Sequence, residues 1–181
     1  VESFIIDIRD YIVQKYPLPD LRNQLKANPA INSLCKDEDG IFWFSQDRYG
    51  LCIYDSRKEK LKHYSQCQGT RNLPFGDVTN IARSYNHNWI WATSYGPTVF
   101  GLSQQNMEMK EDVRIELGNV TNNPGLITSL FEDPQNNLWI GTTTGLFVYR
   151  IMSATLESIP EVSGPVAGIT QTADSRIWTV I

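Results

Sequence analysis

Histidines, clustered acidic residues and cysteines are the side chains with which this sequence could carry out chemistry. His63 and His87 are the two histidines of the chain. Neither has an acidic residue or a cysteine at the spacing of a metal site or of a nucleophile–base pair. We therefore predict no catalytic residue, no metal site and no cofactor, and we expect both histidines to lie at the surface.

One acidic run, Lys36-Asp37-Glu38-Asp39-Gly40, offers oxygen ligands to a cation. A calcium loop of the EF-hand type needs a longer series of ligands and a terminal glutamate, which this run lacks. A glycine after acidic residues is also typical of a tight turn between two strands. We interpret the run as a turn.

The cysteines Cys35, Cys52 and Cys67 are too few and too irregularly spaced for a metal knuckle or a disulfide scaffold. Cys35 and Cys52 occupy apolar positions of strand-like patterns, where a thiol acts as a small hydrophobic group. We expect both to be buried thiols.

Four of the five tryptophans close a repeated segment. The four segments are INSLCKDEDGIFW from Ile31, VTNIARSYNHNWIW from Val78, ITSLFEDPQNNLW from Ile127 and VAGITQTADSRIW from Val166. Each begins with a β-branched residue, passes through a turn rich in Gly, Asn, Asp or Ser, and ends on tryptophan, which predicts a hairpin. The segments begin about 40–50 residues apart, as propeller blades do. The tryptophans are Trp43, Trp91, Trp139 and Trp178.

A second pair of short β patterns follows three of these hairpins. GLCIYD and KLKHYS follow Trp43, and Gly145 after Trp139 matches Gly50. After Trp91 the same layout is expected with a longer, more polar turn. Four antiparallel strands per unit make a blade. The sequence therefore predicts an all-β chain with no helix: a β-propeller fragment of about four blades, each a four-stranded antiparallel sheet.

Residues 1–181 are accordingly one propeller segment. We assign residues 1–30 to the outer strands of a split blade, 31–77, 78–126 and 127–165 to three blades, and 166–181 to the inner strands of a split blade. The two ends either share one blade and close a ring, or belong to an open arc of a larger ring. Since Val1 is not methionine, we expect the segment to be cut from a longer chain.

The charge and the hydropathy of the sequence argue against two other classes of protein, those that bind nucleic acids and those that span a membrane. The formal net charge is −4 and no stripe of Lys and Arg is present, so we predict no nucleic-acid partner. No apolar run is long enough to span a bilayer, and no signal peptide is recognisable. Any contact with a membrane is expected through segments outside this chain.

The run ITSLFEDPQNNLWIGTTTGLFVYR from Ile127 resembles the two-component regulator propeller repeats of periplasmic sensor domains in hybrid two-component system histidine kinases of Bacteroides-type bacteria. The matching residues are Asp133, Leu138, Trp139, Ile140, Gly141, Thr142, Gly145, Leu146 and Tyr149. In the unit from Val78, Ser84 replaces the aspartate, and in the last unit Thr172 does. The resemblance implies a periplasmic domain that senses oligosaccharides, with a kinase elsewhere in the protein and a homodimer in the full receptor.

Propeller geometry indicates where a ligand would bind. Ligands usually lie over the central axis, on the face formed by the loops from the second to the third strand and by the loops between blades. The loop residues that we expect there are Gln46, Asp47, Arg48, Tyr49, Arg71, Tyr95, Asn122, Asn123 and Thr143. Arg, Tyr and Asn suit a hydroxyl-rich ligand through directed hydrogen bonds and ring stacking. The repeat tryptophans and the glycines Gly50 and Gly145 are expected to be structural, and Trp89, outside the repeat register, could also face a ligand.

Two alternatives stay open beside the sensor. The segment could belong to an enzyme of the streptogramin-lyase type, whose propellers use a histidine with acidic partners near the axis and a divalent metal. It could instead be a platform on which protein partners dock.

Overall fold

The computed structural model describes residues 3–7, 12–16, 31–36, 39–46, 50–64, 77–86, 89–105 and 108–181. Nearly all of the regular structure in these ranges is β. The strands are β1 Ser3–Asp7, β2 Ile12–Tyr16, β3 Ile31–Lys36, β4 Ile41–Gln46, β5 Gly50–Asp55, β6 Lys60–Tyr64, β7 Asn80–Arg83, β8 Ile90–Thr93, β9 Thr98–Gln105, β10 Glu108–Glu116, β11 Ile127–Glu132, β12 Asn137–Thr142, β13 Gly145–Arg150, β14 Thr155–Ser163, β15 Gly168–Gln171 and β16 Ile177–Val180.

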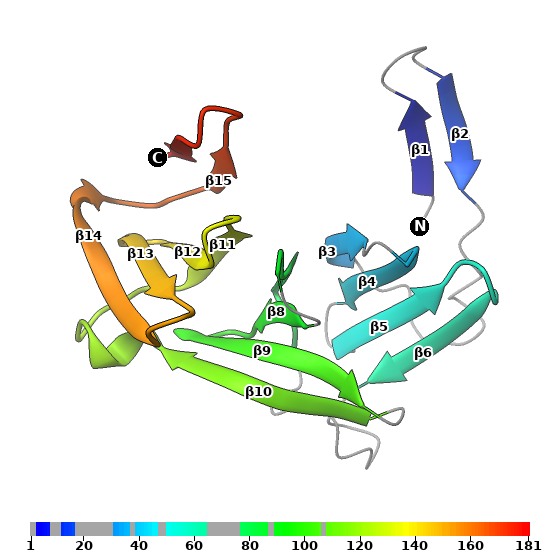
Figure 1. Ribbon diagram of the computed structural model, residues 1–181, viewed down its shortest axis with the longest axis horizontal. Helices are drawn as coiled ribbons and strands as arrows, with labels where there is room; N and C mark the ends of the chain where they lie inside the picture. The colour runs from blue at the N-terminus through cyan, green and yellow to red at the C-terminus, as the bar shows by residue number, and fades with distance from the viewer. Residues whose placement is uncertain are drawn as a thin grey trace.

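These strands form three four-stranded sheets, each built from strands that are consecutive in the chain and antiparallel. We call them blade 1 (β3–β6), blade 2 (β7–β10) and blade 3 (β11–β14). The hairpins β15–β16 and β1–β2 are separate two-stranded sheets, and we use the name blade 4 for β15–β16. The blades follow one another around an arc, with the two hairpins at its opposite ends (Figure 1). The chain is thus a β-propeller fragment, as predicted.

The first strand of each blade lies innermost. Strand β7 contacts β3 on one side and β11 on the other, and β11 contacts β15. Short polar side chains join these inner strands. The Ser33 hydroxyl donates to the carbonyl of Ile81 (3.2 Å) and accepts from its amide (3.1 Å), and Asn80 Nδ2 donates to the carbonyl of Ile127 (3.3 Å).

The apolar residues of the repeat fill the spaces between blades. One buried cluster combines Trp43 and Leu51 of blade 1 with Ile81 and Ile90 of blade 2. A second cluster joins blades 2 and 3, and its buried members are Trp91, Val99, Ile115, Leu117, Ile127, Leu138, Ile140 and Phe147. Blade 2 has a described blade on each of its faces, so its strands read as apolar runs rather than as one-sided alternation.

The two matched glycines stand at the start of the third strand in their blades for different reasons. Gly50 has φ +84°, a conformation in which a side chain is strained. At Gly145 an added Cβ would lie 2.9 Å from the carbonyl oxygen of Val162, too close for any other residue. The first requirement is one of backbone conformation, and the second comes from the close approach of strand β14.

Blade 2 differs from expectation in its outer hairpin. The sequence predicted a longer turn between its third and fourth strands, but the additional residues extend the strands instead, with Gln105 paired to Glu108. Met109, near the start of β10, is buried together with Leu102 in the cluster between blades 1 and 2, which stabilises the longer strands. Polar composition alone therefore misplaced the strand ends.

The prediction of a chain without helix needs one small correction. Leu117–Asn119 (η2) forms a single turn of 3-10 helix directly after β10. Leu117 is fully buried, and its amide donates to the carbonyl of Pro97 (3.0 Å). This turn fixes the loop that leads from blade 2 to blade 3.

The two end hairpins do not pair with each other. The strands β1 and β2 form one two-stranded sheet and β15 and β16 another. The assignment of both ends to one split blade, and the division of the chain at residues 31, 78, 127 and 166, stay predictions.

Candidate functional site

The loops that were expected to bind a ligand meet at one end of the strands. They are residues 94–97 between β8 and β9, 143–144 between β12 and β13, and the connections 117–126 and 164–167 that lead into blades 3 and 4. We call this surface the loop face. The opposite end of the strands carries the turns between the first two strands of each blade.

Hydrogen bonds hold the part of the loop face around Thr143 in place. Its amide donates to the carbonyl of Leu126 (2.9 Å), and its hydroxyl accepts from the amide of Leu126 (3.1 Å). Thr144 Oγ1 donates to the carbonyl of Pro124 (2.8 Å). Gly125 has φ +72°, and a Cβ there would lie 2.4 Å from Thr143 Oγ1. The two loops therefore form one rigid unit.

Side chains on this unit point to solvent. Asn122, Asn123 and Thr143 are exposed, and so is Leu126. Tyr95, on the neighbouring loop of blade 2, is 68% exposed. This combination of two amides, a hydroxyl and two apolar groups can donate, accept and stack. It makes no charged or metal-binding site.

The remaining predicted loop residues belong to blade 1. Gln46 ends strand β4 and pairs with Gly50 across the hairpin. Asp47, Arg48, Tyr49 and Arg71 lie outside the described residues. The ligand-binding assignment of all nine loop residues stays a prediction. Sequence reasoning missed Leu126 and Thr144, although the turn signal Asn-Pro-Gly at residues 123–125 marks the loop that contacts them.

At the opposite end of the strands, the turn between β11 and β12 shows why an aspartate and a tryptophan occur together in the repeat. Asp133 is buried, and its carboxylate accepts from the amides of Gln135 and Asn137 (both 2.9 Å). The indole of Trp139 also donates to it (2.9 Å). One carboxylate thus closes the turn and satisfies the indole, which requires this spacing in the sequence.

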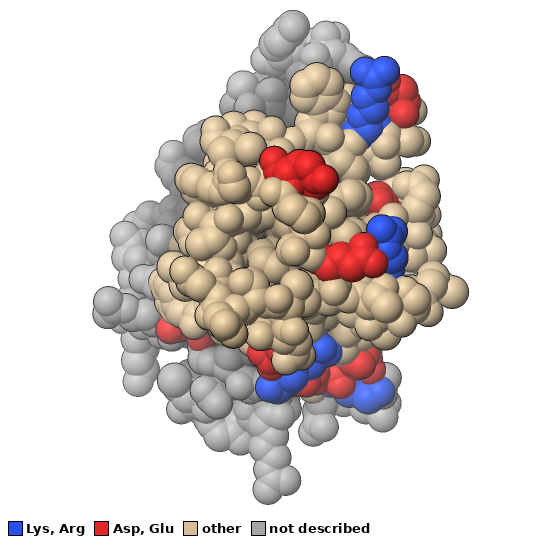
Figure 2. All heavy atoms as spheres, turned by 90° about the vertical axis from the view of Figure 1, so that its left-hand side faces the viewer, with Lys and Arg blue, Asp and Glu red and all other residues tan. Residues whose placement is uncertain are grey.

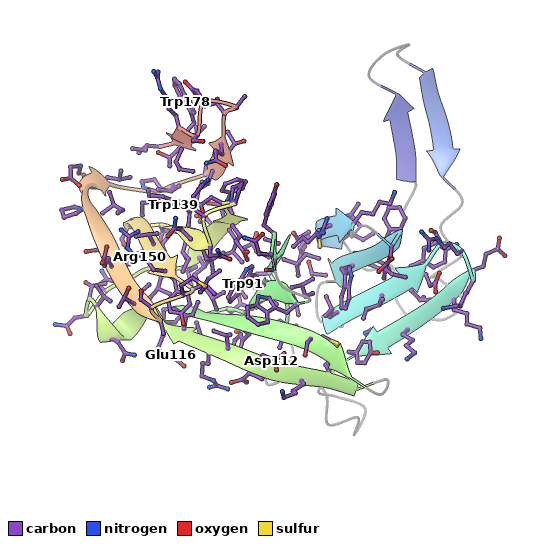
Figure 3. The ribbon with its side chains drawn as sticks, viewed as in Figure 1. Trp91, Asp112, Glu116, Trp139, Arg150 and Trp178 are labelled. Carbon is purple, nitrogen blue, oxygen red and sulfur yellow. The ribbon has the colours of Figure 1, made fainter. Side chains whose placement is uncertain are left out.

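The four repeat tryptophans differ in how far the next blade covers them, and Figure 3 labels three of them, Trp91, Trp139 and Trp178, on successive sheets. Trp43 and Trp91 are buried between successive blades, and Trp139 is partly buried. Trp178 is 56% exposed, because no described residue of a following blade lies over it. Leu34, on the other side of blade 1, is 57% exposed for the matching reason.

Trp89 lies in the interior rather than toward a ligand. Its ring is partly buried and meets the ring of Trp91 edge-on, with 5.7 Å between the centroids. It packs against the cluster between blades 2 and 3. The structure therefore favours packing over ligand contact for this residue.

The positions of His63 and Cys52 show which reactive side chains the described part of the chain could offer to catalysis or to a metal. His63 lies on the outermost strand of blade 1, paired with Cys52, and is partly buried. His87 lies outside the described residues. Burial raises the pKa of the Cys52 thiol to about 12, so this thiol stays protonated at neutral pH. Within the described ranges, no group of three or more His, Cys, Asp or Glu could hold a metal ion.

The charged side chains are dispersed. Figure 2 shows Lys and Arg interspersed with Asp and Glu over the described part of one side of the molecule, with no basic area. Several of these charges pair with each other, as Arg114 does with Glu111 (2.8 Å) and Arg150 with Glu157 (3.3 Å). No helix among the described residues is long and apolar enough to cross a membrane.

A comparison with protein families found one match. Residues 123–144 match the model described as "Two component regulator propeller". The matched segment comprises the loop 123–126, strands β11 and β12, and Thr143 and Thr144 on the loop face. The residues on which the resemblance was based at Asp133 and from Leu138 to Thr142 fall inside it. A search of curated proteins found no match.

Solved structures similar to the chain are propellers. Two structures of the extracellular domain of BT4673 from B. thetaiotaomicron, described in one as a one component and in the other as a hybrid two component system, match 97% of the chain. The TM-score is 0.65 in both cases, with 19% and 20% identity. The chain spans 23% of the length of that domain.

Enzymes share the same fold. Virginiamycin B lyase from Staphylococcus aureus matches 99% of the chain, with a TM-score of 0.66, 19% identity and 56% of its own length covered. The gluconolactonase XC5397 from Xanthomonas campestris matches 98%, with a TM-score of 0.67, 12% identity and 61% of its length covered. At these identities the similarity shows the fold, and the chemistry must be argued from the site.

Proposed function

We propose that this chain is a ligand-binding propeller segment of a hybrid two-component system sensor. It recognises oligosaccharides on the loop face, in the periplasm, and performs no catalysis. The signal passes to a histidine kinase elsewhere in the full protein, which is anchored in the inner membrane by segments outside this chain and acts as a homodimer.

The observation that carries the proposal is the placement of the regulator-propeller match. Residues 123–144 include the rigid unit of the loop face, with Asn123 and Thr143 exposed on it. Tyr95 presents an aromatic ring on the adjoining loop. Amides and hydroxyls on a rigid backbone, next to an exposed ring, suit the hydroxyl groups and apolar ring faces of a sugar.

Two further points support a sensor. The similar BT4673 structures are described as an extracellular domain of a one or two component system. Among the described residues no group of three or more His, Cys, Asp or Glu could hold a metal ion, and the exposed groups named on the loop face are amides, a hydroxyl and apolar side chains, which suit binding.

The lyase alternative is favoured only by the shared fold. A lyase of that type would need a histidine near the axis, whereas His63 lies on the outermost strand of blade 1. If His63→Ala abolished a magnesium-dependent lyase activity, the enzyme assignment would replace ours. Docking of a protein partner on the loop face is distinguished by hydrogen exchange of the full receptor, which would show protection without any glycan.

Calorimetric titration with a panel of oligosaccharides tests the proposal. We expect heat with at least one glycan, and a loss of about 5- to 30-fold in affinity in Tyr95→Ala, because one stacked ring contributes about 1–2 kcal/mol. Tyr85→Ala is the matched control: Tyr85 is 60% exposed on the same sheet but at the opposite end of strand β8. Equal losses in both variants, or no heat across the panel, would contradict the proposal.

A further inference from the structure

A buried indole needs a hydrogen-bond acceptor, and blade 2 does not obtain one as blade 3 does. In blade 3 the acceptor for Trp139 is Asp133, in the turn of its own blade. In blade 2 the residue at that place is Ser84, and the turn before Trp91 is one residue longer. Trp91 is nevertheless fully buried, so leaving its N–H unpaired would be costly.

The acceptor for Trp91 comes from the next blade. Glu132, the last residue of strand β11 in blade 3, is only 5% exposed. Its Oε2 accepts from the indole of Trp91. Its Oε1 accepts from the backbone amides of Tyr85 (3.0 Å) and Asn86 (3.4 Å), in the turn of blade 2.

The same turn makes further contacts with blade 3. The Asn86 side-chain amide donates to the carbonyl of Pro134 (3.2 Å) and to Oδ1 of Asn136 (2.9 Å). The turn of blade 2 is therefore bonded to the turn of blade 3 through both backbone and side chain. Glu132 and Asp133 are adjacent in the sequence. Glu132 accepts hydrogen bonds from blade 2, whereas Asp133 accepts them from its own blade 3.

No other repeat has an acid at this position. The residues equivalent to Glu132 are Lys36, Arg83 and Gln171 in the remaining units. Between blades 1 and 2 the inner strands are joined by the neutral hydroxyl of Ser33. Hydrogen bonds to a carboxylate are stronger than those to a neutral acceptor, so Glu132 holds the donors of blade 2 more firmly than a neutral side chain would.

We infer that Glu132 is an inter-blade latch: it supplies from blade 3 the acceptor that blade 2 lacks, and so makes the turn and the tryptophan of blade 2 depend on blade 3. The turn of blade 2 and its contact with blade 3 then form and open together.

Amide and indole hydrogen exchange, followed by NMR, tests the latch in the 181-residue chain. In Glu132→Gln one of the two acceptor oxygens becomes an NH2 donor, so the side chain can accept either from the Trp91 indole or from the Tyr85 and Asn86 amides. We expect exchange at the group that faces the NH2 to become about 10- to 100-fold faster, the loss for bonds to a charged acceptor. In the matched control Asp133→Asn, the Trp139 indole should accelerate while the Tyr85 and Asn86 amides keep their rates.

The unaltered chain gives a test that survives if Glu132→Gln does not fold. The Tyr85 amide should then be protected at least about tenfold, although its side chain is largely exposed, because Glu132 holds it. Exchange of that amide at the rate of an unstructured peptide would overturn the inference. So would equal acceleration of both tryptophan indoles in Glu132→Gln and in Asp133→Asn.

Discussion

At the scale of the residue, the turn aspartate of the repeat works as an acceptor for several donors at once. Asp133 is buried and takes bonds from two backbone amides, from the Asn137 side chain and from the Trp139 indole. A carboxylate is needed because a hydroxyl, such as those of Ser84 and Thr172 in the other units, cannot accept from so many groups. The paired aspartate and tryptophan are thus one structural device.

Replacing Asp133 should therefore destabilise the chain. We expect Asp133→Ala to lower the free energy of unfolding by about 2–3 kcal/mol, since it leaves buried donors unsatisfied. Urea denaturation measures this loss. Asp174→Ala removes an exposed carboxylate from the equivalent turn of blade 4 and should cost less than about 0.5 kcal/mol. Equal costs would show that the burial of Asp133 has no energetic role.

The Cys52 thiol makes stability depend on pH in a definite direction. Its pKa is about 12 in the folded chain because of burial, whereas an unfolded thiol ionises near pH 8.5–9. Between these values the unfolded state has lost a proton that the folded state keeps, so stability falls as pH rises, by about 1.4 kcal/mol per pH unit for this group. Below pH 8 the contribution is constant. Urea denaturation from pH 7 to 11 should show a shallower decline in Cys52→Ala than in the unaltered chain, and parallel curves would refute the assignment.

At the scale of the element, hydrogen bonds hold the loop from β10 to β11 in one conformation. Its 3-10 turn is tied to Pro97, and its last residues are tied to Thr143 and Thr144. Both ties connect segments that are distant in the chain. The Asn-Pro-Gly signal predicts a turn here, but it does not indicate which threonines bond to the loop, because that depends on the register of β11 on β12.

Gly125→Ala should disturb this loop. The φ of +72° strains any other residue, and the added Cβ would collide with Thr143 Oγ1. We expect a loss of about 1–3 kcal/mol in the free energy of unfolding and a weaker response to glycans. Gly118→Ala, on the same connection, meets nothing within 4 Å and is the control. A Gly125→Ala chain as stable as Gly118→Ala would mean that the loop is not held as described.

At the scale of the whole molecule, the sequence predicts the blades because each blade repeats the same local requirements. The hairpins, their turns and the tryptophan positions follow from Ile31, Val78, Ile127 and Val166 onward without knowledge of the arrangement of the sheets. Contacts between blades could not be predicted in this way. Glu132 is an ordinary acidic residue in the sequence, and only the packing of blade 3 on blade 2 gives it three donors from another blade.

The same limit explains two of the departures from expectation. Strands β9 and β10 are long, and Met109 near their far end is buried in the core between blades 1 and 2. Trp178 carries the repeat pattern and yet is exposed, since its partner surface would come from another blade. The local sequence pattern predicts that a strand forms, whereas the length of the strand and the burial of its side chains depend on the blades packed against it.

The central claim is that the loop face of these radially arranged blades binds a glycan. Hydrogen exchange of the chain with and without the oligosaccharide that gives the largest calorimetric heat tests it most directly. The account predicts slower exchange at residues 94–97, 117–126 and 143–144, and no change in the turns around Tyr85 and Asp133 at the opposite end of the strands. Protection at those turns, with the loop residues unchanged, would contradict it.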